Sequence, residues 1–393
     1  MPTSSAQIRA YTGHALFSYG FRPFFLFGAL WAAIAVALWL PMLSGHLVIP
    51  SRFSPIEWHV HELLFGYVPA IVAGFLLTAV PNWTGRLPVV GPRLLSLFLV
   101  WLAGRVVVLF SDWTGAGISA VVDLAFLCAL IGVIAREIIA SRNTRNLKVL
   151  VGAGLLLVGN GLFHLESATG IGDGHGTRLG IGATILLIML IGGRIIPSFT
   201  HNWLARRGPG KLPTQFNRFD GAVMAASGLT LASWVVAPQA VATAWLALIA
   251  AGLNTARLAR WAAHRTSAER LVLILHVAYA FVPVGFLLLA LGILRPDIVL
   301  PSGALHAWTT GAIGVMTLAV MTRASLGHTG QPLTATRPIE LIYLAAVLAA
   351  LARIAAAFDI LREPMLHVSA TAWVLAFGGF VIVYAPLLLQ RRA

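Results

Sequence analysis

The chain has 393 residues, of which 59% are hydrophobic and only 10% are charged. So few charged side chains cannot cover the surface of a water-soluble protein of this length, and lipid must therefore be the solvent for most of it. The net charge of +14 does not indicate nucleic-acid binding, because the basic residues alternate along the chain instead of gathering in one domain. We expect membrane lipid as a partner and no nucleic acid.

Apolar runs of about 20 residues, the length that crosses a bilayer as a helix, alternate with short polar or Pro- and Gly-rich segments. The pattern predicts an all-α polytopic membrane protein with about twelve transmembrane helices. The predicted spans lie near residues 22–43, 57–80, 93–111, 118–140, 147–167, 178–199, 219–236, 239–263, 268–292, 303–325, 337–359 and 363–389. No connection is long enough for a soluble domain, so we expect residues 1–393 to form a single transmembrane domain.

The basic residues predict the orientation of these spans. Twenty-one of the 27 Lys and Arg lie before the first span, in even-numbered connections or after the last span. Basic residues are enriched in cytoplasmic connections, so both termini are predicted to be cytoplasmic. The first 20 residues lack the short apolar core of a cleavable signal peptide, and the first span is expected to serve as an uncleaved anchor.

A short polar text recurs at the inner ends of the second, sixth and tenth predicted spans. The three segments are LTAVPNWTGR, GRIIPSFTHNW and MTRASLGHTG. A period of four spans predicts three quasi-repeats of four helices around a pseudo-axis, similar to the arrangement of haem-copper oxidases. Coincidence between short polar segments explains the likeness equally well.

Histidine is frequent, with 12 residues against 13 acidic ones, and its position in depth is informative. The motif WHVHE places His59, His61 and Glu62 at the predicted outer end of span two. Imidazole is the usual protein ligand of haem iron and copper. In a regular helix His59 and His61 point about 200° apart, whereas His59 and Glu62 share a face and could act as a ligand and its orienting carboxylate. Anchoring of the span at the headgroups by Trp and His is the alternative.

The other histidines fall into two sets by depth. His164 and His306 reach the same outer level as WHVHE, while His276 and His328 belong to an inner set. His164 and His276 lie within apolar text, where an imidazole needs a ligand or hydrogen-bonding role to offset the cost of burial. We hypothesise an outer site formed by His59 or His61 with His164 and His306.

Two arginines, Arg105 and Arg353, lie inside predicted spans and need partners there. Asp123 and Asp359 could pair with them, and haem propionates are the alternative because a guanidinium group binds a carboxylate bidentately. Arg22 lies at the inner end of span one. Its possible partners are an acidic side chain, a haem propionate and, as a third candidate, a lipid phosphate. The chain contains a single cysteine, which excludes a CxxCH attachment of haem, so any haem would be bound noncovalently.

Four segments together resemble the NnrS family of haem- and copper-containing bacterial membrane proteins. They are SYGFRPFFLFG, EWHVHELLFGYVPAIVAGFLLTAVPNWTGR, GGRIIPSFT and HAWTTGAIGVMTLAVMTRASLGHTG. The resemblance implies a multi-pass inner-membrane protein of nitric oxide metabolism and nitrosative-stress protection in denitrifying or host-exposed bacteria, with bound haem b and copper. The motif histidines of the family correspond to His59, His61, His164, His276, His306 and His328. Their division between iron and copper is left open.

The mechanistic comparison is with haem-copper oxidases and the related nitric oxide reductases. The chain lacks their HPEVY text and their adjacent pair of histidines, so an equivalent binuclear centre is not expected.

The leading interpretation is a haem- and copper-binding protein that reduces or otherwise consumes nitric oxide, an oxidoreductase if it turns over, with a redox partner. Arg22, Arg105 and Arg353 are the candidate cofactor-binding cations. One alternative is a transporter or channel that uses buried His, Arg and Asp. Another is a noncatalytic helper that inserts or stabilises metal in denitrification enzymes.

Overall fold

The computed structural model of the protein describes residues 11–86, 88–142, 146–300 and 302–391. Within these ranges 12 helices are long and apolar enough to span a membrane, and none of the described residues is in a β-strand. The predicted all-helical polytopic fold is therefore confirmed. The elements are η1 (Ala15–Phe17), α2 (Phe21–Leu43), α3 (Pro55–His61), η2 (Glu62–Tyr67), α4 (Val68–Thr84), α5 (Pro92–Leu109), α6 (Ser111–Thr114), α7 (Ala116–Ala140), α8 (Leu147–Thr169), α9 (His175–Leu204), α10 (Arg218–Val236), α11 (Val241–Ala259), η4 (Ala263–Arg265), α12 (Arg270–Leu294), α13 (Ser302–His306), η5 (Ala307–Val315), α14 (Met316–Thr329), α15 (Arg337–Ala357) and α16 (Arg362–Leu389).

The spans agree with the sequence prediction to within a few residues, and the sixth differs most. It was predicted at 178–199, whereas α9 covers His175–Leu204. The additional turns carry polar residues, His175 at the start and His201 near the end, so the apolar run marks only part of the helix. Hydropathy locates the hydrocarbon layer better than it locates the ends of a helix.

Spans two and ten are not regular helices. Each consists of a short α-helix ending in a histidine, then a π-helical segment, then a longer α-helix: α3, η2 and α4 in span two, and α13, η5 and α14 in span ten. Such π segments are frequent at functional sites. His61 and His306 therefore occupy the same position, immediately before the π segment, in the two spans.

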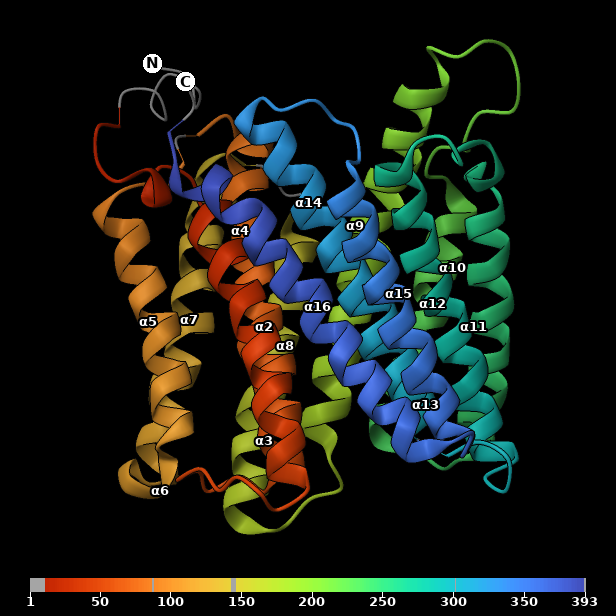
Figure 1. Ribbon diagram of the computed structural model, residues 1–393. Helices are drawn as coiled ribbons and strands as arrows, with labels where there is room; N and C mark the ends of the chain where they lie inside the picture. The colour runs from red at the N-terminus through yellow and green to blue at the C-terminus, as the bar shows by residue number, and fades with distance from the viewer. Residues whose placement is uncertain (1–10, 87, 143–145, 301, 392–393) are drawn as a thin grey trace. The chain divides into compact units, whose positions relative to one another are not determined.

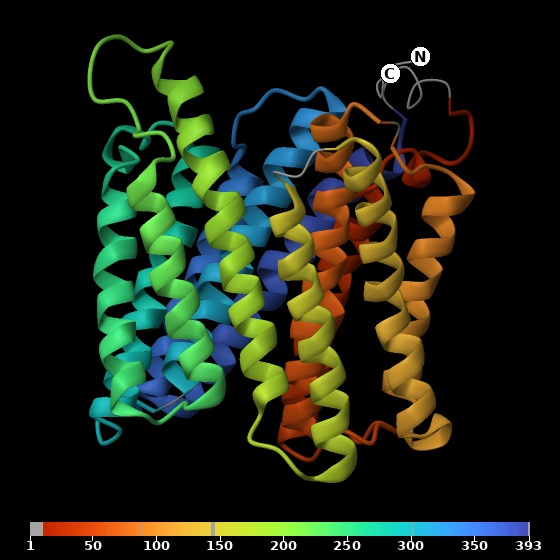
Figure 2. The same cartoon turned by 180° about the vertical axis from the view of Figure 1, so that it is seen from behind.

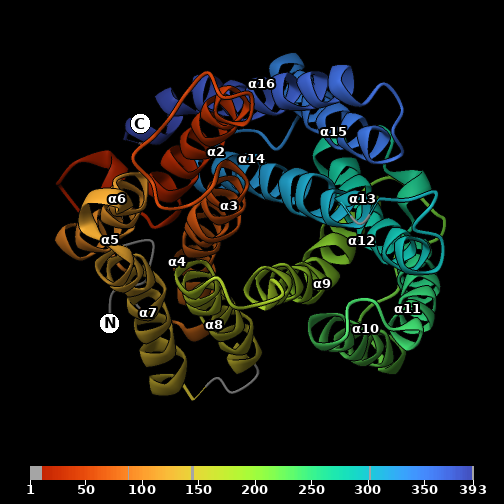
Figure 3. The ribbon, with the colours of Figure 1, turned by 90° about the horizontal axis from the view of Figure 1, so that it is seen from below.

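The described chain forms two compact units. Among the described residues, unit 1 comprises those in 11–180 and 380–391, and unit 2 comprises those in 181–379. In unit 1, α5 packs beside α7 (Figure 1), and α7 packs beside α8, as the view from behind shows (Figure 2). The end-on view shows α4 between α2 and α7 (Figure 3). Span two thus lies in the centre of unit 1. It is the most buried of the described spans, since 78% of its apolar window is buried.

Unit 2 has its own buried polar network. Arg257 on α11 is fully buried, and its Nε donates to Asp220 Oδ1 on α10 over 2.9 Å. Its Nη1 donates to the hydroxyl of Tyr279 on α12, which in turn donates to Asn254 Oδ1. The cation and the carboxylate neutralise each other, which is the condition for placing either of them among membrane helices.

Helices α8 and α9 approach each other closely through glycines within unit 1. A Cβ at Gly176 would clash with the backbone nitrogen of Phe163 and would lie 2.7 Å from the carbonyl oxygen of Gly159. Small residues allow this kind of contact between membrane helices. Because Phe163 directly precedes His164, the contact fixes the position of that histidine.

We predict opposite effects for two glycine substitutions that affect this unit. Gly176→Ala should lower the thermal unfolding temperature of the protein in detergent, with a loss of about 1–3 kcal/mol, because backbone atoms must move apart. Gly154→Ala is the control, since a Cβ at Gly154 on α8 would meet no atom within 4 Å. It should leave stability unchanged or raise it by up to about 1 kcal/mol. Equal effects of the two substitutions would contradict the close contact.

Candidate metal centre

Local structure at the start of span two fixes the position of His61. Ser54 and Glu57 form a capping box, in which Ser54 Oγ accepts from the Glu57 backbone at 3.3 Å and Glu57 Oε2 accepts from the Ser54 backbone at 2.9 Å. Pro55 occupies the first turn, where its missing N–H has no cost. The helix is therefore held at a defined starting point, six residues before His61, whose side chain is fully buried.

The π segment that follows brings Glu62 to His61. Glu62 Oε1 lies 2.8 Å from His61 Nδ1, and both side chains are fully buried. The other carboxylate oxygen, Oε2, accepts from Trp31 Nε1 on α2 at 2.7 Å. The helical pattern pairs Glu62 with His59 instead, but the contacts of its carboxylate described here fix the orientation of the His61 ring.

Arg105 on α5 links the two carboxylates of the site. Its Nη1 donates to Glu62 Oε2 at 2.7 Å, and its Nη2 donates to Asp123 Oδ1 on α7. Gly66 makes room for the guanidinium group, because a Cβ there would clash with Arg105 Nη1. The pairing of Arg105 with Asp123, one of the two alternatives inferred from the sequence, is therefore present, and Glu62 is a second partner.

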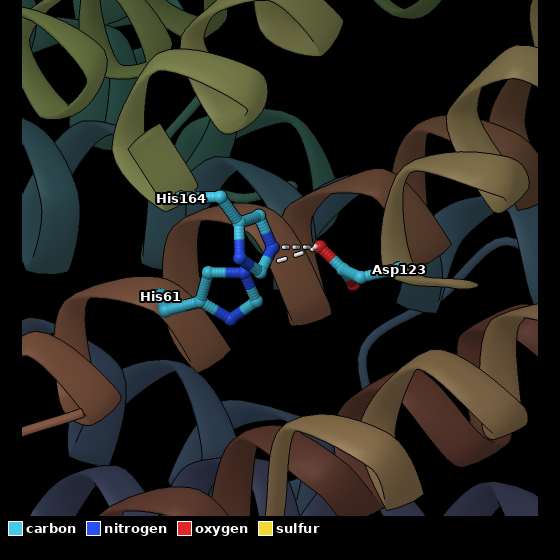
Figure 4. Close-up of side chains that lie close together, drawn as sticks. All are labelled: His61, Asp123 and His164. Carbon is cyan, nitrogen blue, oxygen red and sulfur yellow. Dashed lines mark hydrogen bonds and ion pairs between the residues drawn. The ribbon is translucent and has the colours of Figure 1, made fainter. Parts of the chain in front are cut away.

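Asp123 Oδ2 is the point where the site converges. It lies 3.2 Å from His61 Nε2 and 3.1 Å from His164 Nε2, and it accepts from Asn160 Nδ2 at 2.7 Å. Figure 4 shows the two imidazoles on the same side of the carboxylate. Asn160 and His164 both come from α8, four residues apart, and so share one face of that helix. We refer to His61, Asp123 and His164 as the His61 cluster.

The three residues share a depth in unit 1. His61 lies six residues after the start of α3, Asp123 seven after the start of α7 and His164 five before the end of α8. At 1.5 Å per residue each is roughly 8–10 Å from the adjacent helix end. The sequence-based expectation that His61 and His164 lie at the same level is consistent with these positions.

The charges around the His61 cluster do not balance when its histidines are neutral. Glu62 and Asp123 supply two negative charges, and Arg105 supplies one positive charge. Burying net charge in a membrane-spanning segment is costly, so one further positive charge is needed. A proton on His61, whose two ring nitrogens both face carboxylates, or a bound metal ion would supply it.

The cluster brings three potential ligand atoms close enough together to hold a metal ion. One ligand atom from each residue lies within 4.8 Å of the others, and all three side chains are buried. With metal–nitrogen bonds of about 2.0–2.1 Å, neighbouring ligands of a tetrahedral site are roughly 3.3 Å apart. The distances of 3.1 and 3.2 Å to Asp123 Oδ2 match that spacing. The contact of Glu62 with His61 Nδ1 is the usual way of directing the other ring nitrogen at a metal.

The same residues do not fit a haem. The axial ligands of a haem iron approach from opposite faces of a flat ring. Here both imidazole nitrogens lie within hydrogen-bond reach of a single carboxylate oxygen, which leaves no space for a macrocycle between them. The His61 cluster is therefore a candidate for a single metal ion.

Comparison with known proteins identifies the family. The sequence profile of the NnrS protein family matches residues 15–392, nearly the whole chain. The chain belongs to the NnrS family. No curated protein matches the chain.

The remaining motif histidines of this NnrS-family chain have separate surroundings. The ring of His59 stacks on Trp39 with 4.0 Å between centroids, in unit 1. In unit 2, His276 Nε2 lies 2.9 Å from the Thr200 hydroxyl, and His306 Nδ1 lies 2.7 Å from the Ser302 carbonyl oxygen. His328 is exposed in the last turn of α14. Their roles as metal ligands stay predictions.

The two other candidate arginines also differ in their surroundings. Arg22 Nη1 donates to the carbonyl oxygens of Leu388, at 2.9 Å, and Gln390, at 2.7 Å, and so links the start of α2 to the end of α16. Arg353 is half-buried on α15 and forms no ion pair with any residue that the structure describes, Asp359 included. Asp359 is exposed in the turn after α15, six residues further along the chain. The cofactor-binding role of both arginines remains a prediction.

The sequence pattern does not indicate that Asn160 and Glu62 belong to this arrangement. Asn160 could have been noticed as the polar residue four before His164 in an otherwise apolar span. The contact of Glu62 with His61 carries no sequence signal, because it depends on a π segment that hydropathy does not reveal. Asp123 was considered as an ion-pair partner of Arg105 but not as a metal ligand.

We predict that Arg105→Gln strongly destabilises the protein. It leaves two buried carboxylates without the arginine that pairs with both of them, which should cost about 3–5 kcal/mol in the free energy of unfolding. Arg86→Gln is the matched control, because Arg86 pairs with Glu137 near the surface with 44% of its side chain exposed, and it should cost at most about 1 kcal/mol. Chemical denaturation in detergent would measure both. Similar losses for the two variants would show that Arg105 does not balance the buried charges.

Proposed function

We propose that this NnrS-family membrane protein holds a transition-metal ion in the His61 cluster and acts on nitric oxide there. The observation that carries the proposal is the convergence of two buried imidazoles and a carboxylate beside an unbalanced negative charge. Membrane-buried ionisable groups of this kind are expensive and are typical of functional sites.

Copper is the metal that we propose. A monovalent cation would neutralise the site when both histidines are neutral, and imidazole is a good ligand for copper. The resemblance to copper-containing family members points the same way. Two histidines and one carboxylate also form the ligand set of non-haem iron(II) sites, so metal analysis must distinguish copper from iron.

The residues of the chain would have distinct tasks in such a site. His61, Asp123 and His164 would hold the ion, and Glu62 would keep the His61 ring in the tautomer that presents Nε2. Arg105 and Asn160 would hold the Asp123 carboxylate in place. Phe53, Phe65 and Phe163 contact the imidazole rings and would keep bulk water away while allowing a small uncharged gas to reach the site by partition. A bound copper ion would supply redox chemistry and a binding position for nitric oxide.

The proposal also includes haem b, which would be bound by residues of unit 2 and not by the His61 cluster. His306 has its Nδ1 fixed by the Ser302 carbonyl, the usual orientation of a metal-ligating histidine. We propose His306 and the other motif histidines of unit 2 as the candidate haem ligands, a bacterial inner membrane as the location, cytoplasmic termini and an external redox partner.

We predict that metal binding depends on the His61 cluster. Purified protein should contain about one copper ion per chain at this site, and Asp123→Asn should lose it because a charged ligand is removed. Elemental analysis and an optical spectrum, which reports any haem Soret band separately, would measure this. Asp220→Asn is the control, since it removes the buried carboxylate that pairs with Arg257 in unit 2 and should leave the metal content unchanged. Well-folded protein without any transition metal would overturn the proposed site, and iron in place of copper would overturn the choice of metal.

We also predict consumption of nitric oxide by the metal-loaded protein. Under anaerobic conditions with an added reductant, a nitric oxide electrode should record uptake by the unmodified protein and by Asp220→Asn but not by Asp123→Asn. Metal-loaded protein that consumes no nitric oxide would contradict turnover and favour the noncatalytic helper.

A further inference from the structure

A small pocket lies directly beside the His61 cluster, within unit 1. It is formed by the segment before α3, the α6–α7 region and the last turns of α8. Its lining includes Arg52, Phe53, Ser111, Ser119, His164 and Ser167. The empty space is about 340 Å³ including its open mouth, so it suits a ligand of a few atoms and not a large cofactor.

The lining has the chemistry of an anion site. Arg52 is its one charged residue, beside three serine hydroxyls, and none of the lining residues is acidic. The Arg52 side chain forms no ion pair with any residue in the described part of the chain. Ser119 Oγ donates to the Gly115 carbonyl oxygen at 2.9 Å, so the Arg52 guanidinium group is the main donor that the lining offers to a small anion.

The structure holds Arg52 at this pocket through its backbone. The Arg52 N–H donates to Ser111 Oγ at 2.9 Å, and Ser51 Oγ donates to the Val108 carbonyl at 3.0 Å. The Asp112 N–H donates to the Pro50 carbonyl at 3.1 Å. These bonds attach the segment before α3 to the α5–α6 turn, so the backbone of Arg52 is held at the pocket while its side chain is exposed.

His164 connects the pocket to the cluster. Its Nε2 faces Asp123 Oδ2, while the residue itself is part of the pocket lining. Phe53 stands beside it, with ring centroids 5.6 Å from His164 and 5.1 Å from His61. A ligand in the pocket is thus separated from the three converging ligand atoms by one imidazole and one aromatic ring.

We propose that this pocket binds a small monovalent anion, held by Arg52 among the serine side chains next to His164. Anion binding follows from the pocket alone.

Charge-selective thiol labelling tests this directly. The one native cysteine, Cys128, is exposed and is first replaced by Ser. Ser167→Cys then places a thiol in the pocket wall of the full-length protein, and an anionic and a cationic methanethiosulfonate reagent of similar size are compared. We expect the anionic reagent to react faster at Ser167→Cys, and sodium azide to slow its reaction.

Removal of the Arg52 charge should abolish both effects. Arg52→Gln should lower the ratio of anionic to cationic labelling rates by about tenfold, because a unit charge within a few ångströms is lost. Arg295→Gln is the matched control: it removes an arginine that is paired with Asp297 in unit 2 and should leave the ratio unchanged. The proposal would be overturned if the ratio of anionic to cationic labelling rates were near one with Arg52 present. It would also be overturned if Arg52→Gln left that ratio unchanged.

The experiment includes a second reporter position and a repeat in a variant of the His61 cluster. Ala116→Cys, also in the pocket lining, serves as a second reporter if Ser167→Cys folds poorly. Absence of labelling at both positions would also overturn the proposal, because the pocket would then not admit a small ion. The measurement is repeated in the Asp123→Asn background. Anion selectivity there should persist without the metal, so failure of the metal proposal and failure of the anion proposal give different results.

Discussion

The arrangement of unit 1 depends on the electrostatic cost of placing two carboxylates among membrane-spanning helices. Glu62 and Asp123 come from different spans, and Arg105 from a third span bridges them. Each contact of the guanidinium group requires close backbone approach, which Gly66 on span two and Gly104 on α5 permit because neither has a side chain in the way. Charge compensation therefore contributes to the packing of spans two, three and four beside apolar contact.

Both units contain buried carboxylates that need positive charges nearby, but the charges balance in only one of them. In unit 2 the buried Asp220 has Arg257 as a partner and the half-exposed Arg260 nearby, so no negative charge is left over. In unit 1 two carboxylates share a single arginine, and the nearest additional groups are imidazoles. The difference in charge balance explains why only the unit 1 network, among the residues described, has the character of a cation site.

Much of this could be predicted from the sequence, and the exceptions have physical causes. Apolar runs located the twelve spans, since hydropathy directly measures what a bilayer requires. His61, His164 and the pairing of Arg105 with Asp123 were identified because polar residues in such runs are conspicuous. The contact of Glu62 with His61 was missed, since a helical pattern assumes 3.6 residues per turn and span two changes to a π segment at Glu62. The convergence of His61, Asp123 and His164 depends on which spans are neighbours, which no local pattern records.

The depth of the His61 cluster has a consequence for bioenergetics. It lies about two turns from the helix ends on one side of unit 1. Protons and electrons that reach it from that side would meet there after crossing only a small part of the hydrocarbon layer. Moving a charge through the whole membrane potential involves about 2.3 kcal/mol per 100 mV, and a reaction supplied from one face avoids this exchange. A reaction that took both its protons and its electrons from that side would be electroneutral and would neither draw on nor add to the proton-motive force.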